Sequence, residues 1–224
     1  MNRNSLAKAS ALVVVTMLGV AYAAGSAVPA DLSLPIHWGL DGQPDRYSDK
    51  WTALSLPAFA TAAVSLLFYF LPSLEPRKQG LERSQGLYLR GWASLLIMGA
   101  FLQLAVLSPA LGWELPADRL VVGGMGLMLV MIGNQLGKSR SMYLVGIRTP
   151  WTLASEEVWI KTHRLGGKLM VSAGLLMAVA ALLPIPSRLL MALTAGAIAV
   201  SAIVPVVYSF LLWRREAGNG QPSE

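Results

Sequence analysis

Long runs without charge alternate with short polar segments along the chain. Six stretches contain no Asp, Glu, Lys or Arg, namely residues 9–30, 51–74, 91–113, 120–137, 169–187 and 189–213. Each stretch has 18 to 25 residues, and an α-helix of about 17–25 apolar residues crosses the hydrocarbon core of a bilayer. The pattern therefore predicts an all-α, polytopic membrane protein with six transmembrane helices. It excludes a soluble globular domain and a disordered chain.

The basic residues predict how these helices are oriented. Of the 18 Lys and Arg residues, all but Arg46, Lys50, Arg119 and Arg188 lie at the two ends of the chain or in the second and fourth connections. Connections rich in Lys and Arg stay in the cytoplasm, so we expect both termini to be cytoplasmic. This orientation accounts for the net charge of +6. The sequence has no basic patch interleaved with aromatic residues, the pattern that would predict nucleic-acid binding.

The first run has a second interpretation, as a cleaved signal peptide. Arg3 and Lys8 precede it, and Ala21-Tyr22-Ala23 resembles a small-residue cleavage site. Cleavage there would leave five spans and an external N-terminus. The uncharged run continues to Ala30, beyond the usual apolar core of about 7–15 residues, which favours a retained span.

Composition removes most catalytic chemistry. Charged residues make up 13% of the chain, against about 25% in an average soluble protein, and the absence of cysteine excludes disulfides and thiol chemistry. His37 and His163 fall on opposite sides of the predicted membrane, and the four aspartates between residues 31 and 49 match no calcium-loop spacing. We therefore expect no enzyme activity, no metal and no cofactor. A membrane enzyme using His163 with Arg148 and Glu156 is the less favoured alternative.

The predicted spans hold few polar side chains. Gln103 and Asn134 are the most polar, and no span contains Asp, Glu, His or Arg. Ion-coupled transporters place such residues at bilayer depth, so the pattern disfavours them. A small passive channel or transporter stays as the alternative function. Gly133 and Gly137 have the four-residue spacing that predicts close helix packing.

The external connection, residues 31–51, combines turn signals with aromatic side chains. Pro35 favours extended backbone, and Asp41-Gly42 and Pro44-Asp45 are strong turn signals. Three aromatic residues are typical of the membrane interface: Trp38, Tyr47 and Trp51. We expect a compact cap whose aromatic rings lie against the lipid headgroups, either as a structural anchor or as a recognition surface.

The cytoplasmic connection, residues 138–168, predicts a short helix. Thr149-Pro150-Trp151-Thr152 interrupts any preceding helix, and Ser155 is a predicted N-cap with acidic residues after it. Gly166-Gly167 predicts the end of this helix, and we expect Trp159 to dip into the interface. The segment is either an amphipathic connector or a docking site for a cytosolic partner.

Both connections resemble the SdpI family of bacterial membrane proteins. The external motif runs from Ile36 to Trp51 and looks like the DUF1648-type region near the start of that family. The cytoplasmic motif comprises Gly133-Asn134, Leu136-Gly137-Lys138, Tyr143, Gly146 to Leu153, Ser155-Glu156, Val158-Trp159 and Thr162 to Lys168. Met142 departs from the family pattern, in which Asn often precedes the Tyr.

The resemblance implies a domain organisation and a function. Residues 1–90 would form an N-terminal membrane region with spans one and two, and residues 91–224 an SdpI-like region with spans three to six, in the plasma membrane of a bacterium. The namesake of the family protects a producing cell against its own secreted killing peptide and retains a winged-helix repressor at the membrane. For this chain, the resemblance implies immunity or signal transduction. The partners would be the lipid bilayer, a killing peptide outside and a winged-helix repressor inside.

Candidate site residues follow from the same resemblance. Those expected to recognise a toxin are His37, Trp38, Pro44, Asp45, Arg46, Tyr47 and Trp51. Those expected to face a cytosolic partner are Asn134, Lys138, Tyr143, Arg148, Thr149, Pro150, Trp151, Glu156, Trp159, His163 and Arg164.

Overall fold

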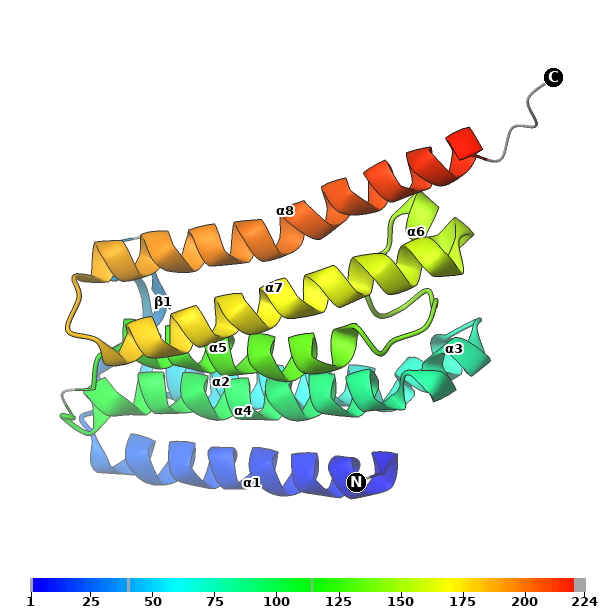
Figure 1. Cartoon of the computed structure of the whole chain (residues 1–224). Coiled ribbons are helices and arrows are strands. Elements are labelled where there is room, and N and C mark those ends of the chain that lie inside the picture. Colours follow the sequence, from blue (N-terminus) through cyan, green and yellow to red (C-terminus); the bar gives the residue numbers. More distant parts are fainter. Residues whose placement is uncertain (1, 40, 114, 220–224) are drawn as a thin grey trace.

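Among the described residues, six long helices run side by side along the molecule (Figure 1). The computed structural model describes residues 2–39, 41–113 and 115–219, with the side chains described as far as residue 216. The long helices are α1 (Arg3–Ala27), α2 (Lys50–Leu74), α4 (Gln85–Ala110), α5 (Ala117–Leu136), α7 (Glu156–Leu182) and α8 (Ser187–Asn219). Each is long and apolar enough to cross a membrane, which confirms the six predicted spans.

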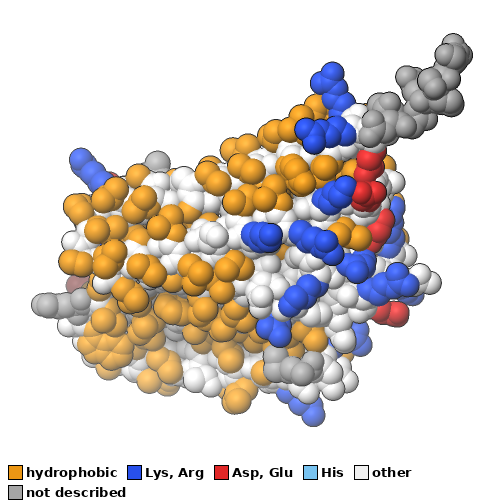
Figure 2. All heavy atoms as spheres, in the orientation of Figure 1, with side chains coloured by type: hydrophobic (Ala, Val, Ile, Leu, Met, Phe, Trp, Pro, Cys, Tyr) orange, Lys and Arg blue, Asp and Glu red, His pale blue; other side chains and the backbone are white. Residues whose placement is uncertain are grey.

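The exterior of this bundle is apolar along its length and charged at one end. Figure 2 shows hydrophobic side chains over most of the visible lateral face, with Lys and Arg gathered towards the end where α3 (Lys78–Arg83) and α6 (Pro150–Ala154) lie. We call this the basic end. Exposed Leu66, Phe70 and Leu182 are among the side chains on the lateral surface. Such a surface is stable in hydrocarbon, where helices satisfy their own backbone polar groups.

The opposite end carries a β-hairpin, which corrects the prediction of an all-α fold. Strands β1 (Ser33–Trp38) and β2 (Pro44–Asp49) pair antiparallel, with a register shift after Pro35. Gly42 adopts a φ of 79° in the turn, whereas Pro44-Asp45, predicted as a turn, begins β2. The hairpin forms because Leu34 is buried in an apolar cluster with α1, α2 and α4, which holds β1 extended beside β2. We call this the hairpin end.

Helices α5 and α7 approach so closely that backbone meets backbone. A Cβ built on Gly133 would lie 2.8 Å from the carbonyl oxygen of Gly167, and one built on Gly167 would lie 2.7 Å from that of Gly133. Gly126 and Gly174 face each other in the same way, seven residues earlier in α5 and seven residues later in α7. The close packing predicted for Gly133 is therefore confirmed, since small residues are what permit such an approach.

The same contact corrects the predicted end of the helix that follows Ser155. Gly166-Gly167 does not terminate it, because α7 continues unbroken from Glu156 to Leu182. Glycine at this position serves the approach to α5, and a helix in a membrane keeps its backbone hydrogen bonds within the segment. The fifth span thus extends well before residue 169, and Lys161, Arg164 and Lys168 are part of its helix.

The α5–α7 contact predicts a contrast between two glycines. Gly167→Ala forces a methyl group against the backbone of α5, and we expect it to lower the stability of the detergent-solubilised protein by about 1–3 kcal/mol. Gly196→Ala is the matched control, because nothing lies within 4 Å of a Cβ there, and alanine in an exposed helix gains about 0.5–1 kcal/mol. Thermal unfolding of both variants measures the difference. Equal melting temperatures would contradict the contact.

Candidate functional site

A buried carboxylate holds the segment that joins α5 to α7. The Glu75 side chain, only 1% exposed, follows α2 directly. Its Oε1 accepts hydrogen bonds from the backbone N–H groups of Arg77 at 2.9 Å and Tyr143 at 3.0 Å, and its Oε2 accepts one from Leu144 at 2.8 Å. A buried charge is stable only when it is paired or hydrogen-bonded. These bonds therefore tie the α5–α7 loop (residues 137–149) to the end of α2.

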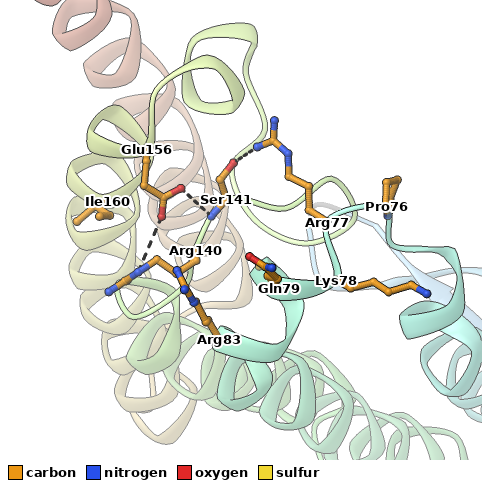
Figure 3. Close-up of a pocket in the computed structure, with 10 residues that line it drawn as sticks. Pro76, Arg77, Lys78, Gln79, Arg83, Arg140, Ser141, Glu156 and Ile160 are labelled. Carbon is orange, nitrogen blue, oxygen red and sulfur yellow. Dashed lines mark hydrogen bonds and ion pairs between the residues drawn. The ribbon is translucent and has the colours of Figure 1, made fainter.

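Arg77, two residues after Glu75, binds the same loop through its side chain. Its guanidinium donates to the Ser141 hydroxyl and to the Tyr143 hydroxyl at 3.3 Å, and also to the Leu153 carbonyl of α6 at 3.3 Å. The guanidinium carbon also lies 4.6 Å from the centre of the Tyr143 ring, in cation–π contact. Figure 3 shows Arg77 directed towards Ser141. Two neighbouring residues of opposite charge thus fix the loop through its backbone and its side chains.

Two fully buried rings lie beneath the loop. Trp159 and His163 are both 0% exposed and stack with their ring centres 3.9 Å apart. The Trp159 indole donates to the Ser139 hydroxyl at 3.2 Å. The predicted position of Trp159 in the membrane interface is therefore wrong. The physical reason is that the loop folds back over this turn of α7 and covers the ring.

His163 joins the loop to α7 through both ring nitrogens. The backbone N–H of Ile147 donates to Nε2 at 2.8 Å, and Nδ1 lies 2.8 Å from the Trp159 carbonyl oxygen. Because Nε2 accepts, the proton must be on Nδ1, and the ring is neutral. Gly146, with a φ of 120°, lets the backbone pass over both rings, since a Cβ there would lie 2.7 Å from Nε2.

The short helix α6 links the loop to α8. The side chains of Thr149 and Thr152 form a reciprocal capping box at its start. The Trp151 indole donates to the Ser209 hydroxyl, and its ring lies 5.3 Å from that of Phe210. Ser209 is thus a partner of the motif that sequence reasoning did not identify.

A charged cavity of about 640 Å³ opens between α3, the loop and the start of α7. It is lined by Pro76, Arg77, Lys78, Gln79, Gly80, Arg83, Arg140, Ser141, Glu156 and Ile160 (Figure 3). Arg140 Nε lies 3.8 Å from Glu156 Oε1, and the backbone N–H of Ser141 donates to Glu156 Oε2 at 3.3 Å. We call it the basic pocket, because it has four cationic side chains and one carboxylate.

The motif residues divide between surface and interior. Those with exposed positions are Asn134, Lys138, Tyr143, Arg148, Pro150, Glu156 and Arg164. Trp151 is half-buried, whereas Thr149, Trp159 and His163 are buried. Glu75 and Arg77, which the sequence analysis missed, position the loop. One sequence signal could have identified them: an acidic residue directly after an apolar run, followed by Pro76 and then by basic residues.

The hairpin exposes several polar and aromatic side chains, which lie on both of its faces because successive residues of a strand alternate. His37 Nδ1 lies 2.6 Å from Asp45 Oδ1, and Arg46 is exposed opposite His37 on the paired strand. Tyr47 is 57% exposed. Trp38 instead packs against the apolar cluster that contains Leu34. Of the predicted outward aromatics, Trp38 therefore faces the protein.

Several contacts position the hairpin and the start of α2 on the bundle. Asp49 caps α2, and hydrogen bonds from Thr52 and from the backbone N–H of Trp51 hold the pKa of its carboxyl below the usual value. A Cβ on Gly42 would lie 2.7 Å from the Cβ of Ser187, so the turn rests on the start of α8. Pro44 and Trp38 line a cavity of about 340 Å³ beside buried Asp118. Trp51 lies over Gly25 of α1.

Glu75→Gln tests the anchoring of the loop. The amide nitrogen would face a backbone N–H, so at least one buried donor loses its acceptor, at a cost of about 1–3 kcal/mol. We expect a lower melting temperature and faster tryptic cleavage after Arg140 and Arg148. Glu82→Gln, on the exposed face of α3, should change neither. If both variants behave alike, Glu75 does not hold the loop.

His163→Phe tests the ring beneath the loop. Phenylalanine keeps an aromatic surface against Trp159 but cannot accept from Ile147, so we expect stability to fall by about 1–3 kcal/mol. His37→Phe, at a half-exposed position in the hairpin, is the control and should unfold close to the wild-type temperature. An unchanged melting temperature for His163→Phe would show that the Ile147 bond contributes nothing.

Comparison with known protein families finds two matches, one in each half of the chain. The SdpI/YfhL protein family matches residues 138–209, which contain the α5–α7 loop, α7 and most of α8. The domain of unknown function DUF1648 matches residues 12–61, which contain the hairpin with parts of α1 and α2. The DUF1648 match therefore extends beyond the external connection into both flanking helices. No solved structure matches the chain.

A curated relative covers most of both chains. The immunity protein SdpI of Bacillus subtilis (strain 168) is 30% identical over 146 residues, which are 65% of this chain and 68% of that protein. The order of the two matched regions also agrees with the resemblance of the two connections. This protein is a multi-pass membrane protein that belongs to the SdpI/YfhL family.

Proposed function

We propose that this protein confers immunity to a secreted, membrane-active killing peptide, with the hairpin as its recognition surface. The relative named an immunity protein supports the role. The structural observation that carries the proposal is the exposure of His37, Asp45, Arg46 and Tyr47 on the hairpin. Arg and Tyr are the residue types that most often dominate binding energy at interfaces.

The hairpin is held in place before any ligand arrives. Leu34 of β1 is buried in the apolar cluster with α1, α2 and α4, the turn contacts Ser187, and Asp49 caps α2. A preformed surface loses little conformational entropy on binding. The positive-inside rule supports a cytoplasmic position for the basic end, because Lys and Arg residues gather there. The hairpin end then faces the side from which a secreted peptide comes.

The basic end would serve a cytosolic regulator in this proposal. Lys138, Arg148 and Arg164 are exposed there and offer charge to a partner. Trp159 and His163 are buried, so their role would be to hold the loop that presents those charges. A winged-helix repressor is the partner that the family resemblance implies. Recognition and signalling would then be separable functions at opposite ends of one bundle.

The bundle interior gives the alternative of transport no specific support. The most polar buried residue of α4, Gln103, donates to the Leu54 carbonyl oxygen at 3.0 Å and thereby braces α4 against α2. A polar side chain used in this way stabilises helix packing.

Survival of cells under a secreted membrane-lytic peptide tests the proposal. We expect Arg46→Ala/Tyr47→Ala to lower protection about tenfold, the equivalent of about 1.4 kcal/mol of binding. Arg148→Ala/Arg164→Ala removes exposed charge at the other end and should leave survival unchanged. Immunoblots of membranes establish that all variants are present at equal levels. If cells with the wild-type protein survive no better than an empty-vector strain, the immunity role is wrong.

A further inference from the structure

We propose that the basic pocket binds a phosphate group, as an anionic phospholipid headgroup or as a free phosphate. The pocket is not part of the hairpin surface, and the inference does not depend on the immunity role. Its cations are Arg77, Lys78, Arg83 and Arg140, and Glu156 is the one carboxylate in its lining. The lining therefore has an excess of three positive charges.

The cations differ in how far the protein already satisfies them. Arg77 is committed to acceptors of the loop. Arg140 lies 3.8 Å from Glu156, which is longer than the usual 2.7–2.9 Å of a strong charged hydrogen bond, about 1 Å too far. Within the part of the chain that the structure describes, Lys78 and Arg83 form no ion pair. The pocket thus keeps donors available for an anion.

Arg83 and Arg140 come together although they are far apart in sequence. The backbone N–H of Arg140 donates to the hydroxyl of Ser84, the residue after Arg83, at 2.8 Å. Figure 3 shows the two side chains on the same wall of the pocket. Like charges held near each other repel, and a bound anion removes that cost. Two guanidinium forks also fit the oxygens of a phosphate, which can accept in pairs.

The position of the pocket suits a headgroup. It lies where α2 ends and α4 begins, beside α3, whose Gly80 and Leu81 are buried while Lys78 and Arg83 are exposed. The ends of transmembrane helices lie at headgroup depth. Pro76 and Ile160 add apolar lining next to the cations. The volume of about 640 Å³ equals roughly twenty water molecules at about 30 Å³ each, which is room for a phosphate with its glycerol.

Native mass spectrometry of the full-length protein in a neutral detergent tests this site. Phosphatidylglycerol, phosphatidylcholine and inorganic phosphate are the three probes. We expect tighter retention of phosphatidylglycerol than of phosphatidylcholine, and an affinity for phosphatidylglycerol about tenfold lower in Arg83→Gln/Arg140→Gln. Arg214→Gln/Arg215→Gln, which removes the same charge from the exposed end of α8, should stay within about twofold of wild type.

The outcomes distinguish a lipid headgroup from free phosphate, and both from general electrostatic attraction to the basic end. Retention of phosphatidylglycerol that millimolar inorganic phosphate does not displace assigns the site to lipid, whereas displacement assigns it to free phosphate. Glu156→Gln is a second variant that removes the opposing carboxylate, and it should raise the affinity. Equal losses in the pocket variant and the α8 variant would overturn the proposal, because general attraction to the basic end would then explain the binding. A melting temperature for each variant verifies folding.

Discussion

The direct approach of α5 to α7 is the constraint on which the rest of the basic end depends. With Gly133 and Gly167 in contact, the two helices leave no room for side chains between them at this level. Helix α5 ends three residues after Gly133, whereas α7 begins eleven residues before Gly167, so the chain that joins them runs back over the first turns of α7. That path places the loop over Trp159 and His163 and against the end of α2. The loop geometry is thus a consequence of helix packing as much as of its own sequence.

Two residues that lie close together in sequence supply the bonds that stabilise the loop. Glu75 and Arg77 are two positions apart, yet one accepts from backbone donors of the loop and the other donates to loop hydroxyls and to a carbonyl of α6. Each partner would be costly to bury alone. Together they convert a segment with little regular structure into a fixed surface. The exposed side chains on that surface are the ones available to other molecules.

Much of this architecture could be predicted from sequence, for identifiable reasons. The length of uncharged runs depends only on bilayer thickness, so all six spans follow from it. The hairpin did not follow, because Pro44-Asp45 has strong turn propensity and only the burial of Leu34 reveals the strand pairing. Trp159 beside charged residues is typical of an interface, and its burial depends on a loop distant from it in sequence. Glu75 was missed because its partners are backbone groups, which no side-chain motif records.

Helix α8 gives the molecule a mechanical property. Its first residue, Ser187, supports the turn of the hairpin, and Ser209 near its other end bonds Trp151 of α6. One continuous helix therefore touches the structure at both membrane surfaces. A shift of α8 along α7 would alter both contacts at once, so this one helix links the two ends geometrically. Pro205 lies within α8 near the second contact, where the missing N–H leaves one helical hydrogen bond unmade.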